Sequence, residues 1–388
     1  MSAYVVPGSG LSGRDRGPRL RPDRRKRLGI LVVFLLTAGL LVVTPATAEA
    51  ATPTLPSGFQ RIATPSAQTA GDLVDFVFLP DTTGATSHNL ITLGKAGGSV
   101  RFVDATGTNR EIAHIDGIYT DGDYGLLSLS LAPDYLTSGQ LAILGTYNSS
   151  ATRADGSMIP MSRLDIYRAS NPTAPTALTF VKTVIGGISQ RDGIEPTNSH
   201  GSGTVVWAPD GSFFAGFGDA ASFGSVDPLA LRALDPDDPH GKILHVDGSG
   251  NAMSTNPFFG RAASNTWRAR MFASGFRNPF RFSLDPTRSN VLYVGDVGWG
   301  TYEKIVIVQA GTVGGWPCFE GVDGQGGFRS AHQDLPQCQG YYGTNQIYQP
   351  GPPTRRRTGW LSLGRAQPHP VEIPPVNDAA TTSSRSSS

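Results

Sequence analysis

The sequence repeats one short pattern four times. Each copy has an apolar run, then a Pro-Asp or Pro-Thr step, a short polar turn and a second apolar or alternating run that ends near Gly. The prolines are Pro80, Pro133, Pro209 and Pro286, so the spacings are 53, 76 and 77 residues. Pro presets the backbone for the first turn position, and Asp or Gly suits the positions that follow. Each copy therefore predicts an antiparallel β-hairpin.

Hairpins repeated at this spacing predict an all-β chain with the architecture of a β-propeller, one blade per repeat and loops gathered on one face. The 48 Gly and 29 Pro among 388 residues agree with a fold of many short strands and turns. The stretch 218–260 has no helical period and is expected to be a loop insertion on the functional face. An irregular β-sandwich is the alternative fold.

Residues 1–50 have the composition of an export signal or an N-terminal anchor. Eight Lys or Arg lie within 1–27, an unbroken apolar run fills 28–43, and small residues with A-x-A spacing surround Ala48 and Ala50. Sixteen apolar residues in a helix span about 24 Å, less than a bilayer core of about 30 Å. A cleaved signal is thus favoured over an anchor, and the chain is expected to be secreted or extracellular. An uncleaved segment would be its only attachment to a membrane.

The other end of the chain has a different composition. The propeller is expected over 51–349, and 350–388 is rich in Pro, Arg and Ser with no strand alternation, which is typical of a disordered tail. Only four repeats are clear before this tail. The expected ring is therefore incomplete at its C-terminus, as a truncated or frame-shifted product would be.

The distribution of charge excludes one class of partner. The net charge is +1, but 51–353 contains 19 basic and 26 acidic residues and is near −7. Nucleic-acid binding requires clustered Lys and Arg to meet the phosphate backbone. An acidic body therefore predicts no nucleic-acid partner.

Two cysteines, Cys318 and Cys338, lie in one short segment. Outside the cytosol, an isolated pair that closes a loop of about 20 residues is most simply a disulfide. A metal-binding pair is the alternative, although no further ligands stand near it in a useful pattern.

Four stretches resemble the secreted glucose/sorbosone dehydrogenases, which are quinoprotein sugar dehydrogenases that use pyrroloquinoline quinone (PQQ). "SHGSGTVVWAPDGSFFAGFGD" resembles that family's His-x-x-Gly strand, which ends in Gly-Asp. "FASGFRNPFRFSLDP" resembles its Gly-x-Arg-Asn-Pro signature. "YGLLSLSLAPDY" and "VGDVGWGTYEKIVIVQAGTVGGWPCFEG" resemble its Gly-Leu-Leu-Gly strand and its acidic loop with a Gly-Trp-Pro turn. The similarity covers about 70 to 345 in the family's order.

The resemblance implies a six-bladed propeller that carries PQQ and calcium on its loop face. It makes His200 the base that accepts the sugar's hydroxyl proton, since an unperturbed His has a pKa near 6.5. Arg277 would stabilise the oxygen on which negative charge develops and contact PQQ, with Asn278 and Asp123 as further cofactor contacts. In other folds His200 would be a strand-edge residue, Arg277 would cap a turn or pair with an acid such as Asp296, and Asn278 would serve a turn.

The resemblance also implies how calcium would be held. The family binds the cofactor's calcium largely through backbone carbonyls, which here would be those of Gly298 and Trp299. A second, structural calcium site in some members uses a carboxylate where this chain has Lys304. An ammonium group cannot ligate calcium, so that second site is not expected here. Glu303 beside it would be an acid of the loop or a solvated surface residue.

The expected function is an exported PQQ- and calcium-dependent oxidoreductase that oxidises the C1 hydroxyl of an aldose and passes electrons to an external acceptor. One alternative is a non-catalytic propeller that serves as a binding module, since propellers have many functions. Another is a truncated, inactive dehydrogenase, because the family clamps PQQ's carboxylates with Lys and Arg from later blades. A third is a propeller lactonase, which would need several carboxylates and an Asn around a central metal.

Overall fold

The computed structural model describes residues 55–58, 72–82, 86–186, 194–195, 199–320, 323–324, 327 and 338. The chain divides into two compact units, Met1–Arg61 and Ile62–Ser388, and every strand and helix belongs to the second. The expected export signal and the expected tail over 350–388 lie outside the described residues. Within the described residues, no helix is both long and apolar enough to cross a membrane.

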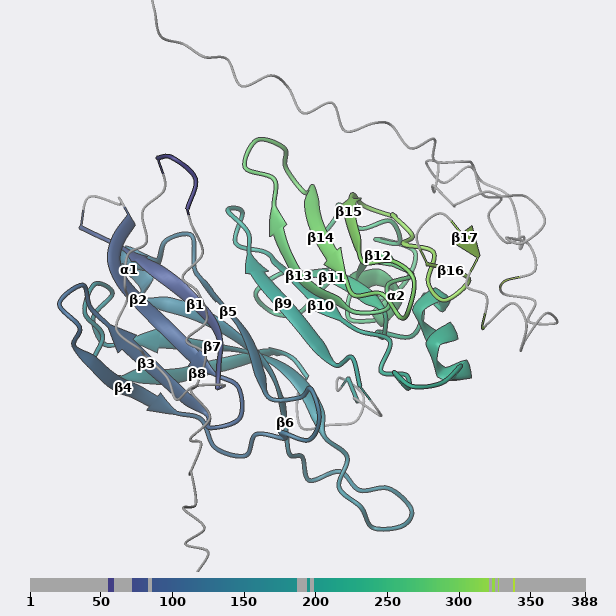
Figure 1. Cartoon of the computed structure of the whole chain (residues 1–388), viewed down its shortest axis with the longest axis horizontal. Coiled ribbons are helices and arrows are strands. Elements are labelled where there is room, and N and C mark those ends of the chain that lie inside the picture. Colours follow the sequence, from purple (N-terminus) through teal and green to yellow (C-terminus); the bar gives the residue numbers. More distant parts are fainter. Residues whose placement is uncertain are drawn as a thin grey trace, which may run out of the picture. The chain divides into compact units, whose positions relative to one another are not determined.

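Among the described residues, the second unit contains four antiparallel sheets of three or four strands and one two-stranded sheet (Figure 1). In each sheet the strands follow one another in sequence order. The first sheet contains β1 (Leu73–Pro80), β2 (Thr86–Gly94), β3 (Ser99–Val103) and β4 (Asn109–His114). The second contains β5 (Leu126–Leu131), β6 (Gln140–Tyr147), β7 (Met161–Ala169) and β8 (Leu178–Ile185). The third contains β9 (Ser202–Trp207), β10 (Phe213–Phe217), β11 (Lys242–Val246) and β12 (Met271–Ser274), and the fourth contains β13 (Pro279–Leu284), β14 (Leu292–Asp296) and β15 (Lys304–Val308).

The remaining elements are short. A one-turn helix α1 (Tyr135–Ser138) lies between β5 and β6, and α2 (Trp267–Arg270) precedes β12. A 3₁₀ helix spans Pro228–Leu234, and β16 (Phe319–Glu320) pairs with β17 (Asp323–Gly324). The expectation that 218–260 is only a loop was wrong, because that stretch contains the 3₁₀ helix and β11. The five residues of β11 are too few for their apolar pattern to separate a strand from a loop.

The Pro turn of each repeat joins the first two strands of one sheet, which confirms the four predicted hairpins. In the third sheet, the Ala208 carbonyl accepts from the Gly211 N–H at 2.9 Å, and Ser212 O accepts from the Ala208 N–H at 2.8 Å. Asp210 Oδ1 accepts from Ser212 N at 3.0 Å. The Asp of the turn thus fixes the loop through a local side-chain bond, as Asp in such turns does.

The first strands of the four sheets lie side by side. Strand β5 packs against β1 and β9, and β9 packs against β13. The hydroxyls of Ser128 and Ser130 accept from Val205 N and Trp207 N at 3.2 and 3.0 Å, so β5 and β9 run in the same direction. The sheets are therefore four blades of a β-propeller, and the sandwich alternative does not hold.

Arg281 of β13 connects the fourth blade to the first two. Its Nη2 donates to Val74 O of β1 at 3.1 Å and to Leu127 O of β5 at 3.0 Å. Burial lowers the pKa of Arg281, and the nearby Asp75 opposes that shift. The innermost strands are thus joined by charge-assisted hydrogen bonds as well as by packing.

Apolar side chains fill the space between neighbouring blades in three clusters. Leu79, Ile91 and Ile143 lie between the first and second blades, and Leu144, Phe213 and Leu244 between the second and third. Phe214, Phe272 and Leu292 lie between the third and fourth. Each such buried side chain contributes about 1.5–3 kcal/mol relative to exposure. Apolar packing between the facing sheets of neighbouring blades is therefore the main interaction that holds the blades together.

The predicted disulfide is present. Cys318 and Cys338 are bonded with Cα atoms 5.3 Å apart, and both are fully buried. The metal alternative for this pair therefore does not hold. The disulfide packs beside Phe319, which is the first residue of β16 and precedes Glu320.

Candidate active site

The residues singled out from the sequence lie where the first strands of three blades begin. Asp123 precedes β5, His200 precedes β9, and Arg277 with Asn278 precedes β13. Because β5 and β9 run in the same direction and β13 packs beside β9, these starting points share one end of the blades. The fold thus gathers on one face residues that are far apart in sequence.

His200 is held in a backbone conformation that few side chains adopt. Its φ is 54°, in the left-handed region, and its N–H donates to Asp123 Oδ2 at 2.9 Å. A Cβ added to Gly218 would lie 2.2 Å from the His200 carbonyl oxygen, so only glycine permits this close approach. His200 is 5% exposed, because this backbone packs it against the end of β10.

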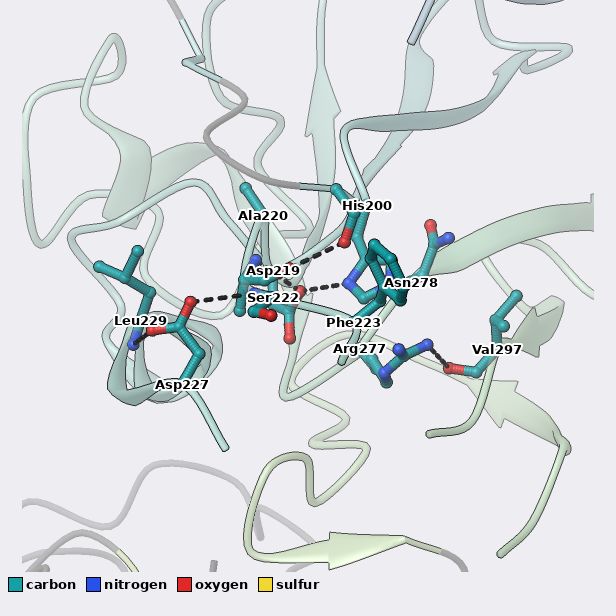
Figure 2. Close-up of polar contacts among 12 residues, drawn as sticks. His200, Asp219, Ala220, Ser222, Phe223, Asp227, Leu229, Arg277, Asn278 and Val297 are labelled. Carbon is teal, nitrogen blue, oxygen red and sulfur yellow. Dashed lines mark hydrogen bonds and ion pairs between the residues drawn. The ribbon is translucent and has the colours of Figure 1, made fainter. Parts of the chain in front are cut away.

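The imidazole of His200 has one clear partner. Its Nδ1 lies 2.7 Å from Asp219 Oδ1 (Figure 2), and Asp219 is fully buried. The other carboxylate oxygen accepts from Trp316 Nε1 at 2.7 Å. An ionised carboxylate only accepts, so the geometry assigns the Nδ1 proton to His200 and leaves Nε2 as an acceptor. This is the tautomer that a general base requires.

Arg277 lies next to this pair. Its carbonyl accepts from the Asp219 N–H at 2.8 Å, and its guanidinium lies 5.7 Å from the centre of the Trp316 ring. Nη1 donates to the carbonyls of Val297 at 3.3 Å and Gly298 at 2.8 Å. Burial lowers the pKa of Arg277, and among the acids that oppose the shift Asp219 has the largest effect. A guanidinium stays charged at neutral pH, so a buried cation lies beside the His200–Asp219 pair.

Asp296, the acid considered as a partner of Arg277, has other partners. Its Oδ2 forms an ion pair with Lys304 Nζ at 2.8 Å, and its Oδ1 accepts from the Asn278 N–H at 2.8 Å. Burial raises the pKa of Asp296, although Lys304 acts against that shift. Lys304 therefore serves as the counter-ion of a buried carboxylate.

Several buried polar atoms in the described part of the chain have no hydrogen-bond partner. Oδ1 of Asp123 and Oδ1 of Asn278 are among them, and both belong to predicted site residues. The other carboxylate oxygen of Asp123 accepts from the His200 N–H, and the backbone N–H of Asn278 donates to Asp296. A buried acceptor without a partner costs about 1–3 kcal/mol, so such atoms mark a place where a ligand's donor would be favourable.

Glu320 organises the loop after β14. Its Oε1 accepts from the N–H groups of Trp299, Gly300 at 2.9 Å, Thr301 at 3.2 Å and Tyr302 at 3.5 Å. Glu320 is only 2% exposed. Four convergent amides stabilise the buried negative charge and fix the backbone of the loop.

The expected calcium ligands lie in this loop. The Gly298 carbonyl already accepts from Arg277 at 2.8 Å, so an ion bound to it would share this oxygen with the guanidinium. Among the described residues, no group of three His, Cys, Asp or Glu side chains is placed to hold a metal.

Sequence reasoning missed Asp219, Trp316 and Glu320. Asp219 ends the quoted Gly-Asp stretch, Trp316 belongs to the Gly-Trp-Pro turn, and Glu320 follows it. All three stand within recognised stretches, but their partners are 19 to 97 residues away. Only the folded chain shows those contacts.

Comparison with known proteins gives a family for this arrangement. A family model for glucose/sorbosone dehydrogenase matches residues 74–352. The curated aldose sugar dehydrogenase YliI from Escherichia coli (strain K12) is 27% identical over 241 residues, which are 62% of this chain and 57% of that protein. The HIPL1 protein from Arabidopsis thaliana is 29% identical over 144 residues, which are 33% of this chain and 20% of the plant protein. The chain thus spans less than two thirds of either relative.

A solved structure shares the fold. It is the PQQ-bound form of an aldose sugar dehydrogenase from Streptomyces coelicolor, with 21% sequence identity, a TM-score of 0.51 and 69% of each chain covered. At this identity the likeness concerns the arrangement of blades alone.

Proposed function

The chain belongs to the glucose/sorbosone dehydrogenase family, and from that premise we propose that it oxidises the C1 hydroxyl of an aldose, with PQQ as the hydride acceptor. The observation that carries the proposal is the His200–Asp219 contact of 2.7 Å beside the buried guanidinium of Arg277. A base with a fixed tautomer and a cation next to it are the two groups that this oxidation requires.

His200 acts on the proton. Removing the C1 hydroxyl proton leaves the electron pair that expels the C1 hydride as the carbonyl forms, so one proton and one hydride leave together. Nε2 of His200 accepts the proton, and Asp219 stabilises the resulting imidazolium through Nδ1. General base catalysis of this kind contributes about a hundredfold to ten-thousandfold.

Arg277, Asn278 and Asp123 would hold the cofactor. PQQ, when bound, supplies a quinone carbonyl carbon that accepts the hydride. Arg277 offers donors to its oxygens, and the free acceptors Asn278 Oδ1 and Asp123 Oδ1 would receive hydrogen bonds from the cofactor or the sugar. These contacts orient the acceptor toward the base and satisfy two buried oxygens.

Calcium and export complete the proposal. The carbonyls of Gly298 and Trp299 would ligate calcium on a loop that Glu320 holds through four amides. The basic and apolar composition of 1–50 supports export, where an external acceptor would take up the electrons. A six-bladed ring, of which four blades are described, is the family architecture that the proposal assumes.

Reconstitution tests this proposal. Purified chain is titrated with PQQ in the presence of calcium, followed by cofactor fluorescence, and then assayed with an aldose and a reducible dye. We expect saturable PQQ binding and sugar-dependent reduction that His200→Gln lowers at least a hundredfold while PQQ binding is kept. Binding without turnover, unchanged by this substitution, would support the non-catalytic alternative.

A further inference from the structure

Phe223 is the most exposed large aromatic side chain in the described part of the chain. It is 70% exposed, whereas Phe76, Phe180 and Phe259 are 52%, 51% and 45% exposed. An aromatic ring left in water forgoes the free energy that its burial would supply. Such a ring therefore requires an explanation from its surroundings.

The backbone around Phe223 is fixed beside the candidate base. Ser199, which precedes His200, donates from Oγ to the Ala221 carbonyl at 2.8 Å. Trp299 Nε1 donates to the Phe223 carbonyl at 2.8 Å. Figure 2 draws Phe223 with His200 and Arg277 in one cluster of residues. The backbone of Phe223 is thus tied to Trp299 and, two residues earlier in the chain, to the residue before His200, although nothing in the sequence analysis assigned Phe223 a role.

Hydrogen bonds to Asp227 also fix the part of the loop that follows Phe223. Asp227 accepts from Ser222 N at 2.9 Å through Oδ2 and from Leu229 N at 3.0 Å through Oδ1, which begins the 3₁₀ helix. Anchors therefore lie on both sides of Phe223. A ligand that meets the ring has little loop entropy to remove, because the backbone is already ordered.

We propose that Phe223 is the apolar platform that receives the C–H face of the substrate's pyranose ring. The inference rests on the proposed function, since it concerns the substrate of the same site. A pyranose presents hydroxyls at its edge and C–H groups on its faces. The polar groups near His200 suit the edge, and an exposed aromatic ring suits a face. Stacking acts equally on the bound sugar and the transition state, so it sets KM and leaves kcat nearly unchanged.

Kinetics of three variants test the platform. Phe223→Ala is expected to raise KM for the aldose about tenfold or more with kcat within about threefold, and Phe223→Trp is expected to keep KM near the wild-type value. Phe259→Ala removes a similarly exposed ring from another loop and serves as the matched control, with no change in KM. An unchanged KM in Phe223→Ala would overturn the inference. So would a weaker PQQ affinity with an unchanged KM, which would place the ring against the cofactor.

A second measurement separates this inference from the proposed function. A 1-deoxy aldose has no C1 hydroxyl and cannot be oxidised, so its binding to the PQQ-loaded chain is followed by saturation-transfer NMR. Binding by the wild type that Phe223→Ala abolishes supports the platform even if no turnover occurs. Turnover with equal binding by both variants overturns the platform and leaves the dehydrogenase function intact. A wild type that neither binds nor turns over overturns both.

Discussion

His200 Nδ1 and Asp219 Oδ1 are 2.7 Å apart, while the second oxygen of the same carboxylate accepts from Trp316 at 2.7 Å. One buried carboxylate therefore orients the His200 imidazole before the third blade's first strand and the turn that follows the fourth blade. Replacing it by an amide would change which nitrogen of His200 carries the proton, with little change in volume.

Asp219→Asn should lower kcat for aldose oxidation by about a hundredfold or more, because the wrong tautomer leaves Nε2 protonated. The measurement is dye-linked turnover at saturating PQQ, with circular dichroism as the test of folding. Asp238→Asn is the matched control, since Asp238 pairs with His240 at 2.6 Å outside the site. Equal losses in both variants would show that the effect is structural.

Arg277→Lys should weaken PQQ binding about tenfold or more, because a lysine lacks the planar fork of donors. Fluorescence titration of PQQ gives the affinity directly. Arg270 is also buried and donates to the Gly250 carbonyl at 2.6 Å, so Arg270→Lys is the control for removing a buried guanidinium. PQQ affinity that is unaltered in Arg277→Lys would argue against Arg277 as a cofactor contact.

Glu320→Gln should weaken calcium binding about tenfold in the presence of PQQ, since the neutral amide holds the 299–302 amides less firmly. Isothermal titration with calcium reports this without turnover. Glu303 accepts from Gly298 N at 3.0 Å and is exposed, so Glu303→Gln is expected to change the affinity little. The loop hypothesis fails if both variants bind calcium as the wild type does.

His245 should make the fold sensitive to acid. Burial lowers its pKa from 6.5 to about 4, and the nearby Asp210 opposes the shift. The unfolded chain therefore binds more protons between pH 6.5 and pH 4, and stability falls as the pH falls through that window by roughly 3 kcal/mol. Denaturant midpoints at pH 7 and pH 4.5 measure it. His245→Gln should show a smaller drop than the wild type, and an equal drop would assign the effect to other groups.

Removing the disulfide should lower the stability of the fold. A bond that closes a loop of about 20 residues contributes about 3 kcal/mol. The double variant Cys318→Ala and Cys338→Ala is therefore expected to lower Tm by several degrees, as measured by calorimetry. Wild-type protein under a thiol reductant should approach the same Tm. A wild-type value in the double variant would show that the bond does not stabilise the native state.

The sequence was sufficient for features set by local chemistry. Pro209 and Asp210 specify their turn within five residues, and Cys318 and Cys338 were the only cysteines available to pair. Contacts set by packing could not be predicted in this way. The family resemblance assigned separate roles to Arg277 and Gly298, with cofactor and metal respectively, whereas the fold places them in a 2.8 Å hydrogen bond.

Asp219 illustrates the limit most clearly. It was visible as the end of a Gly-Asp stretch, but its partner Trp316 is 97 residues away. No period or motif links two positions at that distance. Glu320 was missed for a related reason. Its four donors are backbone amides, which any residue type supplies, so the sequence does not reveal them.

The contact of Arg281 with the first blade has a consequence for biosynthesis. Arg281 and Val74 are 207 residues apart, so this bond cannot form until the first strand of the fourth blade has left the ribosome. At about 5–20 residues per second, the carbonyl of Val74 waits roughly 10–40 s for its donor. During that interval Asp75, beside Val74, lacks its neighbouring cation, Arg281. The first blade therefore completes its polar contacts only after the start of the fourth blade has emerged.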